Sequence, residues 1–215
     1  MKPATLENRN KGLTLIEALA IIVILCILAA LILPPLALAK YKTRRIGCIN
    51  NLKQIGLSFG IFANDHDGKF PMQLSTNNGG SLEFIAGGNA YRHFLALSKE
   101  LSTPKILICP ADKRKALTNF AALNNEHVSY FVGLEAKTNY PGMLLVGDRN
   151  ITNDGLSYAQ NLILTTNQEV GWTREMHHNS GNVVLANGNV QMLGSEDLRE
   201  ALRDSGVATN RLALP

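Results

Sequence analysis

Apolar residues dominate the first part of the chain and form its most distinctive pattern. From Leu13 to Leu33 there are 21 residues with a single charge, that of Glu17. At about 1.5 Å per residue this run makes a helix of about 32 Å, which matches a bilayer hydrocarbon core of about 30 Å. A buried soluble helix rarely stays apolar on every face over this length, and the apolar part of a cleaved secretory signal is shorter, about 7–15 residues. The pattern therefore predicts a membrane-spanning helix.

Beyond Pro35 the apolar residues change to a helical spacing. They recur at steps of three and four, as on one face of an α-helix, at Ile46, Ile49, Leu52, Ile55, Phe59 and Phe62. We therefore predict an amphipathic helix from Leu36 to about Ala63 that continues the membrane segment as one rod. The turn-forming residues 64–68 and then Pro71 end it.

The rest of the chain predicts a small, mostly antiparallel sheet with short helices, which is an α+β fold. Residues 72–90 are rich in Gly, Asn and Ser and indicate a loop, and a short helix is predicted over Tyr91–Leu101. Strands are predicted at Val128–Leu134, Met143–Gly147, Leu162–Thr166, Asn182–Ala186 and Val190–Leu193. Asn187-Gly188 joins the last two and is a strong hairpin signal. Ser195 is the predicted cap of a final helix that runs to about Arg203.

Composition and charge exclude several classes of protein. Hydrophobic residues make up 46% of the chain, which excludes disorder throughout. The net charge is +4, but the basic residues form no stripe interleaved with aromatics, so we expect no nucleic-acid partner. The basic residues flank the apolar run, as they do around membrane segments. More of them follow the run than precede it, which slightly favours a cytoplasmic location for the C-terminal side. Three cysteines exclude a disulfide-dense scaffold.

A specific motif stands at the start of the apolar run. The sequence Lys11-Gly12-Leu13-Thr14-Leu15-Ile16-Glu17 resembles the processing motif of type IV prepilins and type II secretion pseudopilins. The resemblance implies cleavage by a prepilin peptidase between Gly12 and Leu13, methylation of the new amine, and an assembly role for Glu17, the fifth mature residue. It also implies a single-pass inner-membrane protein with an extracytoplasmic (periplasmic) C-terminal domain, in opposition to the slight charge bias.

The resemblance extends into the later part of the chain. Residues 48–56, residues 65–71 and Cys109-Pro110 are similar to a pseudopilin-like group common in Verrucomicrobia and Planctomycetes. Members often end in a His, nine residues and then Asp-Gly. Here His177 is followed at that spacing by Asn187-Gly188, so Asn replaces the usual Asp.

Motifs of catalysis and cofactor binding are sparse, and we predict no enzyme. His177-His178 has no nearby carboxylate in sequence, so a hydrogen-bonded junction between a loop and a strand is favoured over a metal or catalytic role. No firm metal site is predicted, and calcium is the one cofactor left open. Four oxygen donors within seven residues form the calcium candidate, against a polar turn as the alternative: Asp148, Asn150, Asn153 and Asp154.

Two cysteines are candidates for a disulfide bond. Cys48 lies on the predicted rod and Cys109 in a later loop, both on the side expected to be extracytoplasmic, where disulfides persist. A bond between them would staple the globular part to the rod. Two separate buried thiols are the alternative.

These features define four segments and a leading hypothesis. The segments are a leader at 1–12, a transmembrane and assembly helix at 13–35, its amphipathic continuation at 36–63 and a globular pseudopilin-like domain at 64–215. The hypothesis is a structural subunit of a type II secretion or type IV pilus-like filament. Its partners would be the prepilin peptidase, other pseudopilins in a homo-oligomeric filament, an inner-membrane assembly platform and membrane lipid. The alternative is a membrane-anchored extracytoplasmic binding module, and an anchored hydrolase has least support.

Overall fold

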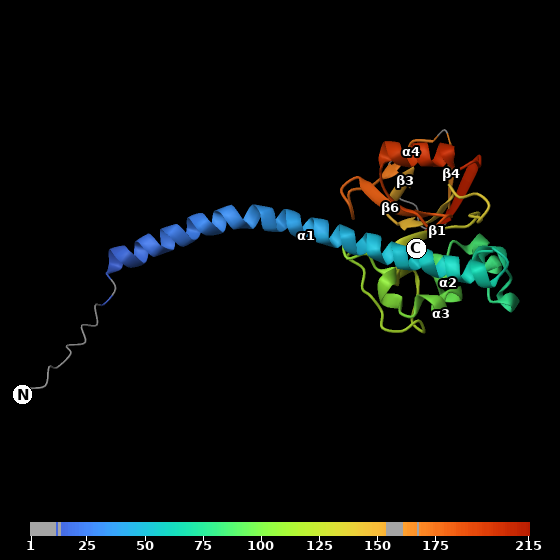
Figure 1. Ribbon diagram of the computed structural model, residues 1–215, viewed down its shortest axis with the longest axis horizontal. Coiled ribbons are helices and arrows are strands. Elements are labelled where there is room, and N and C mark those ends of the chain that lie inside the picture. The colour runs from blue at the N-terminus through green and yellow to red at the C-terminus, as the bar shows by residue number, and fades with distance from the viewer. Residues whose placement is uncertain (1–11, 13, 154–160, 167) are drawn as a thin grey trace, which may run out of the picture. The chain divides into compact units, whose positions relative to one another are not determined.

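The computed structural model describes residue 12, residues 14–153, residues 161–166 and residues 168–215 (Figure 1). The chain divides into two compact units, one up to Lys42 and one over Thr43–Pro215. Helix α1 (Leu15–Asp65) runs through the end of the first unit into the second and includes Pro34 and Pro35. The predicted long helix, which continues beyond Pro35, is therefore confirmed.

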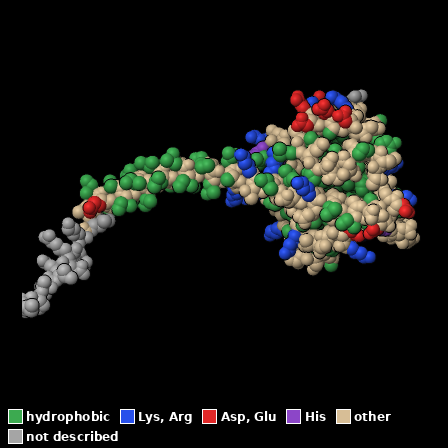
Figure 2. Space-filling model, in the orientation of Figure 1, with side chains coloured by type: hydrophobic (Ala, Val, Ile, Leu, Met, Phe, Trp, Pro, Cys, Tyr) green, Lys and Arg blue, Asp and Glu red, His purple; other side chains and the backbone are tan. Residues whose placement is uncertain are grey.

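The first unit exposes its apolar side chains. Between Leu15 and Leu38 every large apolar side chain whose surroundings the structure describes is exposed. These are Leu15, Ile16, Leu19, Ile21, Ile22, Val23, Ile24, Leu25, Ile27, Leu28, Leu31, Ile32, Leu33, Leu36 and Leu38, and Figure 2 shows apolar side chains along this segment. Among the described residues α1 is the one helix long and apolar enough to cross a membrane. Exposure on all faces suits lipid as the surrounding medium.

In the second unit the last part of α1 packs against a sheet. Its buried stripe has steps of four and three: Cys48, Leu52, Ile55, Phe59 and Phe62. Ile46, which was predicted to lie on this stripe, is 57% exposed. Helix and sheet lie close together at Gly56, where an added Cβ would lie 2.8 Å from a methyl group of Val184.

The main sheet has six strands in the order β4-β8-β1-β2-β6-β7, and every neighbouring pair is antiparallel. The strands are β1 (Tyr130–Gly133), β2 (Leu144–Asp148), β4 (Asn161–Thr165), β6 (Ser180–Leu185), β7 (Val190–Gly194) and β8 (Thr209–Ala213). A second, two-stranded sheet pairs β3 (Ile151–Asn153) with β5 (Val170–Trp172). The α+β class and the antiparallel sheet are confirmed.

Helices and short turns complete the second unit. The helices are α2 (Ala90–Ala96), α3 (Ser98–Leu101) and α4 (Ser195–Asp204). Short 3₁₀ turns are η1 (Pro71–Gln73), η2 (Thr76–Asn78), η3 (Leu82–Gly87), η4 (Pro104–Leu107) and η5 (Asn125–His127).

Both faces of the central strands β1 and β2 are buried, which sets the position of the site. Along β1, Val132 faces a core with α1 while Phe131 faces a second core with α4. Along β2, Leu145 likewise faces the core with α1, and Leu144 faces the core with α4. This alternation is the normal period of a strand. Polar groups at the ends of these central strands are therefore held inside the protein.

Several local predictions need correction. The single helix over Tyr91–Leu101 is two helices, because the chain leaves helical geometry at Leu97. Gly194, and not Ser195, is the N-cap of α4, and its N–H donates to the Asp197 carboxylate at 2.9 Å. The hairpin at Asn187-Gly188 is confirmed, with Gly188 at φ +82°.

Candidate functional site

The start of α1 is closed by a reciprocal cap. The Thr14 backbone N–H and hydroxyl both donate to the Glu17 carboxylate, at 2.8 and 2.7 Å, and the Glu17 N–H donates back to the Thr14 hydroxyl at 3.3 Å. This is a capping box, which satisfies backbone donors that the first turn of a helix leaves unpaired. In the described chain Glu17 is thus a helix cap.

The predicted cleavage site lies just before this cap. Gly12 is exposed, belongs to no helix or strand, and has open space where a side chain would stand. Leu13, on the other side of the predicted cut, lies outside the described residues. Because α1 begins only at Leu15, the residue before the predicted cut is not locked into helical hydrogen bonds.

A buried polar cluster lies inside the second unit. It contains Cys48 from α1, Cys109 from the loop after η4, Asp148 at the end of β2 and His177 from the turn before β6. One sulfur, nitrogen or oxygen atom of each lies within 4.8 Å of those of the others.

Hydrogen bonds and close contacts connect the members of this cluster. The Cys48 thiol donates to Asp148 Oδ1 at 3.1 Å. His177 Nε2 lies 3.3 Å from Cys109 Sγ and 3.4 Å from Asp148 Oδ2. The backbone and the side-chain amide of Asn182 donate to Asp148 Oδ2 at 2.7 and 2.8 Å.

Burial controls the protonation of the cluster. Burial raises the pKa of Asp148 to about 6, although the hydrogen bonds from Cys48 and Asn182 act to lower that pKa. Burial lowers the pKa of His177 to about 4, so the imidazole is neutral near pH 7 and its contact with Asp148 is not an ion pair. Burial also raises the pKa of the Cys48 thiol, which is therefore a proton donor.

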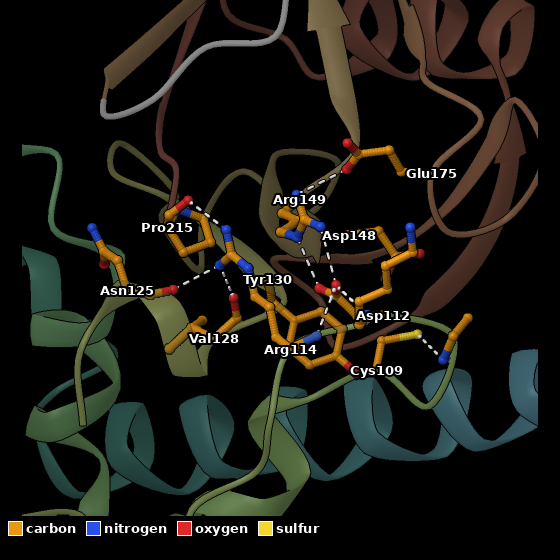
Figure 3. Close-up of polar contacts among 12 residues, drawn as sticks. Cys109, Asp112, Arg114, Asn125, Val128, Tyr130, Asp148, Arg149, Glu175 and Pro215 are labelled. Carbon is orange, nitrogen blue, oxygen red and sulfur yellow. Dashed lines mark hydrogen bonds and ion pairs between the residues drawn. The ribbon is translucent and has the colours of Figure 1, made fainter. Parts of the chain in front are cut away.

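An ion pair fixes the loop that carries Cys109 (Figure 3). Asp112 accepts two hydrogen bonds from the Arg149 guanidinium, at 2.8 and 3.0 Å, and its side chain is only 1% exposed. Burial alone would raise the pKa of Asp112, but the hydrogen bonds and charge of Arg149 lower that pKa below its usual range. Arg149 directly follows Asp148 at the end of β2. The same strand end therefore supplies Asp148 to the cluster and, through Arg149, anchors the loop that carries Cys109.

The predicted site residues are only partly brought together. The disulfide candidates Cys48 and Cys109 lie in one cluster as free thiols, so the bond between them stays a prediction. His177 adjoins Asp148, a carboxylate 29 positions earlier in the chain that sequence spacing did not connect to it. Asn187 and Gly188 lie instead in the β6–β7 hairpin.

The calcium candidate also stays a prediction. The carboxylate of Asp148 faces Cys48, His177 and Asn182, while the Asn150 amide donates to backbone carbonyls of Thr173 and Ser180, at 3.1 and 3.2 Å. Asn153 is buried in β3, and Asp154 lies outside the described residues.

Comparison with known proteins identifies the N-terminal segment. Residues 8–33 match the family model of the prokaryotic N-terminal methylation motif. No curated protein and no solved structure matches the chain. The matched range contains Gly12, Thr14 and Glu17 together with the whole apolar run from Leu13 to Leu33. The chain therefore carries a prepilin-type N-terminal signal.

Proposed function

We propose that the protein is a pilin-like structural subunit that is made as a membrane precursor, cut after Gly12 by a prepilin peptidase and assembled into a filament. The observation that carries this proposal is the methylation motif at residues 8–33, at the head of an exposed apolar helix. The filament belongs to a type II secretion system or a related type IV pilus-like machine. The role is mechanical and needs no catalytic group.

The local geometry supports cleavage at this position. A peptidase must reach the bond after Gly12, and exposed chain outside regular structure is where proteolysis concentrates. Gly12 meets this requirement, and the cap formed by Thr14 and Glu17 lies beyond the cut. Cleavage therefore leaves the helix and its cap intact.

The membrane arrangement follows from the same signal. The apolar part of α1 anchors the protein in the inner membrane as a single span, and the second unit lies on the periplasmic side. The second unit bears the buried cluster and has its own core on both faces of the sheet. In the assembled filament the apolar helices pack together, which in lipid depends on close van der Waals contact and polar pairing rather than on the hydrophobic effect.

Processing is tested on the full chain, expressed with a prepilin peptidase and isolated from membranes. Intact-mass analysis should show loss of residues 1–12 and one added methyl group on Leu13. In Gly12→Val the uncut precursor should accumulate, because a side chain blocks the approach of the peptidase. Gly60→Val is the matched control, since Gly60 is also exposed with open space around it, and it should be cut normally. A wild-type protein that retains Met1 would contradict the proposal.

A further inference from the structure

Four segments of the second unit bring metal-ligating atoms to one buried point. They supply two sulfurs, from Cys48 and Cys109, one imidazole nitrogen, from His177, and one carboxylate, from Asp148. All four residues are buried, with Cys48, Cys109 and Asp148 at 0% exposure and His177 at 1%. A buried carboxylate and a buried imidazole are costly to remove from water unless they are hydrogen-bonded, paired or bound to a metal.

The spacing of these atoms matches a tetrahedral ion. Ligand atoms at about 2.0–2.3 Å from a tetrahedral zinc ion lie about 3.3–3.8 Å from one another. The contacts in the cluster are 3.1 Å for Cys48 Sγ to Asp148 Oδ1, 3.3 Å for Cys109 Sγ to His177 Nε2 and 3.4 Å for His177 Nε2 to Asp148 Oδ2. These three contacts, which involve both oxygens of Asp148, lie within a few tenths of an ångström of the tetrahedral spacings, and one ligand atom of each residue lies within 4.8 Å of those of the others.

We propose that Cys48, Cys109, Asp148 and His177 bind one divalent ion of the zinc class. Thiolate and imidazole ligands select zinc over calcium and magnesium, which prefer oxygen. Four protein ligands fill the tetrahedral shell and leave no position for water or substrate, so the site is structural. The inference is independent of processing at Gly12.

Contacts around the four residues are of the kind that support a metal centre. Asn182 fixes the Asp148 carboxylate through two hydrogen bonds, as outer-shell partners of ligating carboxylates do. The Ala111 N–H donates to Cys109 Sγ at 3.4 Å, a contact of the kind that orients a ligating atom. The charge of Arg45 acts on both Asp148 and His177 and offsets the excess negative charge of two thiolates and a carboxylate around a divalent ion.

Metal binding has a defined proton balance. His177 is neutral and offers its nitrogen directly, whereas the two thiols must each release one proton to solvent as their sulfurs bind the ion. The proton that Cys48 shares with Asp148 is one of these. Coordination then ties α1 to the Cys109 loop, the end of β2 and the turn before β6. The same two sulfurs cannot be joined in a disulfide while they bind the ion, so the two arrangements exclude each other.

The test uses the full chain in detergent, isolated from membranes without chelators. Elemental analysis should find one zinc per chain, and cobalt(II) added to the metal-free, reduced protein should give the absorption of a tetrahedral thiolate site. Cys48→Ser and Cys109→Ser should reduce bound metal to background. Cys26→Ser is the matched control, because Cys26 lies in the apolar part of α1 outside the cluster, and it should keep one zinc per chain. Asn182→Ala should weaken zinc binding by about 10- to 100-fold.

The wild-type measurements decide the question even if a variant fails to fold. Folded, reduced protein that binds neither zinc nor cobalt at micromolar concentration would overturn the proposal and leave the cluster as a hydrogen-bonded network. A Cys48–Cys109 disulfide in protein isolated from membranes, shown by non-reducing peptide mapping, would overturn it as well.

Discussion

His93 shows how burial of one residue makes the stability of the protein depend on pH. Its side chain is fully buried in α2 and Nδ1 is hydrogen-bonded to the Ser81 hydroxyl at 2.8 Å, but Nε2 has no hydrogen-bond partner among the described residues. Burial lowers the pKa of His93 to about 4 from an ordinary value near 6.5. Between these values the unfolded chain binds more protons than the folded one, so the free energy of unfolding falls as pH falls from about 6.5 to 4.

We expect His93→Gln to flatten this part of the pH profile. A tenfold difference in proton affinity between the folded and unfolded chain is worth about 1.4 kcal/mol, so His93 should account for roughly 3 kcal/mol of stability lost between pH 7 and pH 4. The free energy of unfolding is measured by urea unfolding of the full chain in detergent. The signal is the fluorescence of Trp172, the single tryptophan. The comparison is the difference between wild type and variant at each pH. Parallel profiles would show that His93 does not titrate in this range.

Elements differ in how far the sequence predicts them. The rod and five strands follow from long or repeated apolar patterns, and these were predicted. The strands β3 and β5 have three residues each, too short for a period to show, and β8 includes the polar residues Asn210 and Arg211. These three strands were missed.

The buried cluster depends on contacts between distant segments, and this limits its prediction. The sequence connected Cys48 with Cys109, but it connected neither Asp148 nor His177 to them. His177 reaches the cluster because the chain reverses at His178 and Asn179, which have φ values of +52° and +60°. Turns with positive φ are usually marked by glycine, and no glycine marks this one.

A pair of glycines on α1 tests how the helix and the sheet pack. Gly56→Ala places a Cβ 2.8 Å from the buried Val184, whereas Gly60→Ala, one turn later, meets nothing within 4 Å. Both changes gain about 1 kcal/mol of helix propensity, but overpacking at Gly56 costs about 1–3 kcal/mol. Urea unfolding should therefore find Gly60→Ala more stable than wild type and Gly56→Ala less stable than Gly60→Ala. Equal stability of the two variants would contradict the close contact.

At the scale of the whole molecule, the proposed function would give Glu17 a second role beside the helix cap, and the two can be separated. In the described chain it caps α1 through Thr14. After cleavage the new amine at Leu13 lies four residues away, and the carboxylate can instead pair with the amine of a neighbouring subunit. A carboxylate within a membrane helix costs several kcal/mol if unpaired, and an ion pair at about 4 Å is worth about 4 kcal/mol at an effective dielectric constant of about 20. Such pairing would set the register of apolar helices that otherwise slide along one another.

Glu17→Gln separates these roles, because glutamine completes a capping box but has no charge. We expect the variant to be cut and inserted normally while cross-linked filament ladders fall at least about tenfold, since each 1.4 kcal/mol of lost pairing is a factor of ten. Thr14→Ala is the matched variant, because it removes the hydroxyl from the cap and keeps the Glu17 charge, and its ladders should remain. Normal ladders from Glu17→Gln, with loss in Thr14→Ala, would instead make the helix cap the feature that assembly requires. Normal ladders from both variants would show that assembly depends on neither role of Glu17.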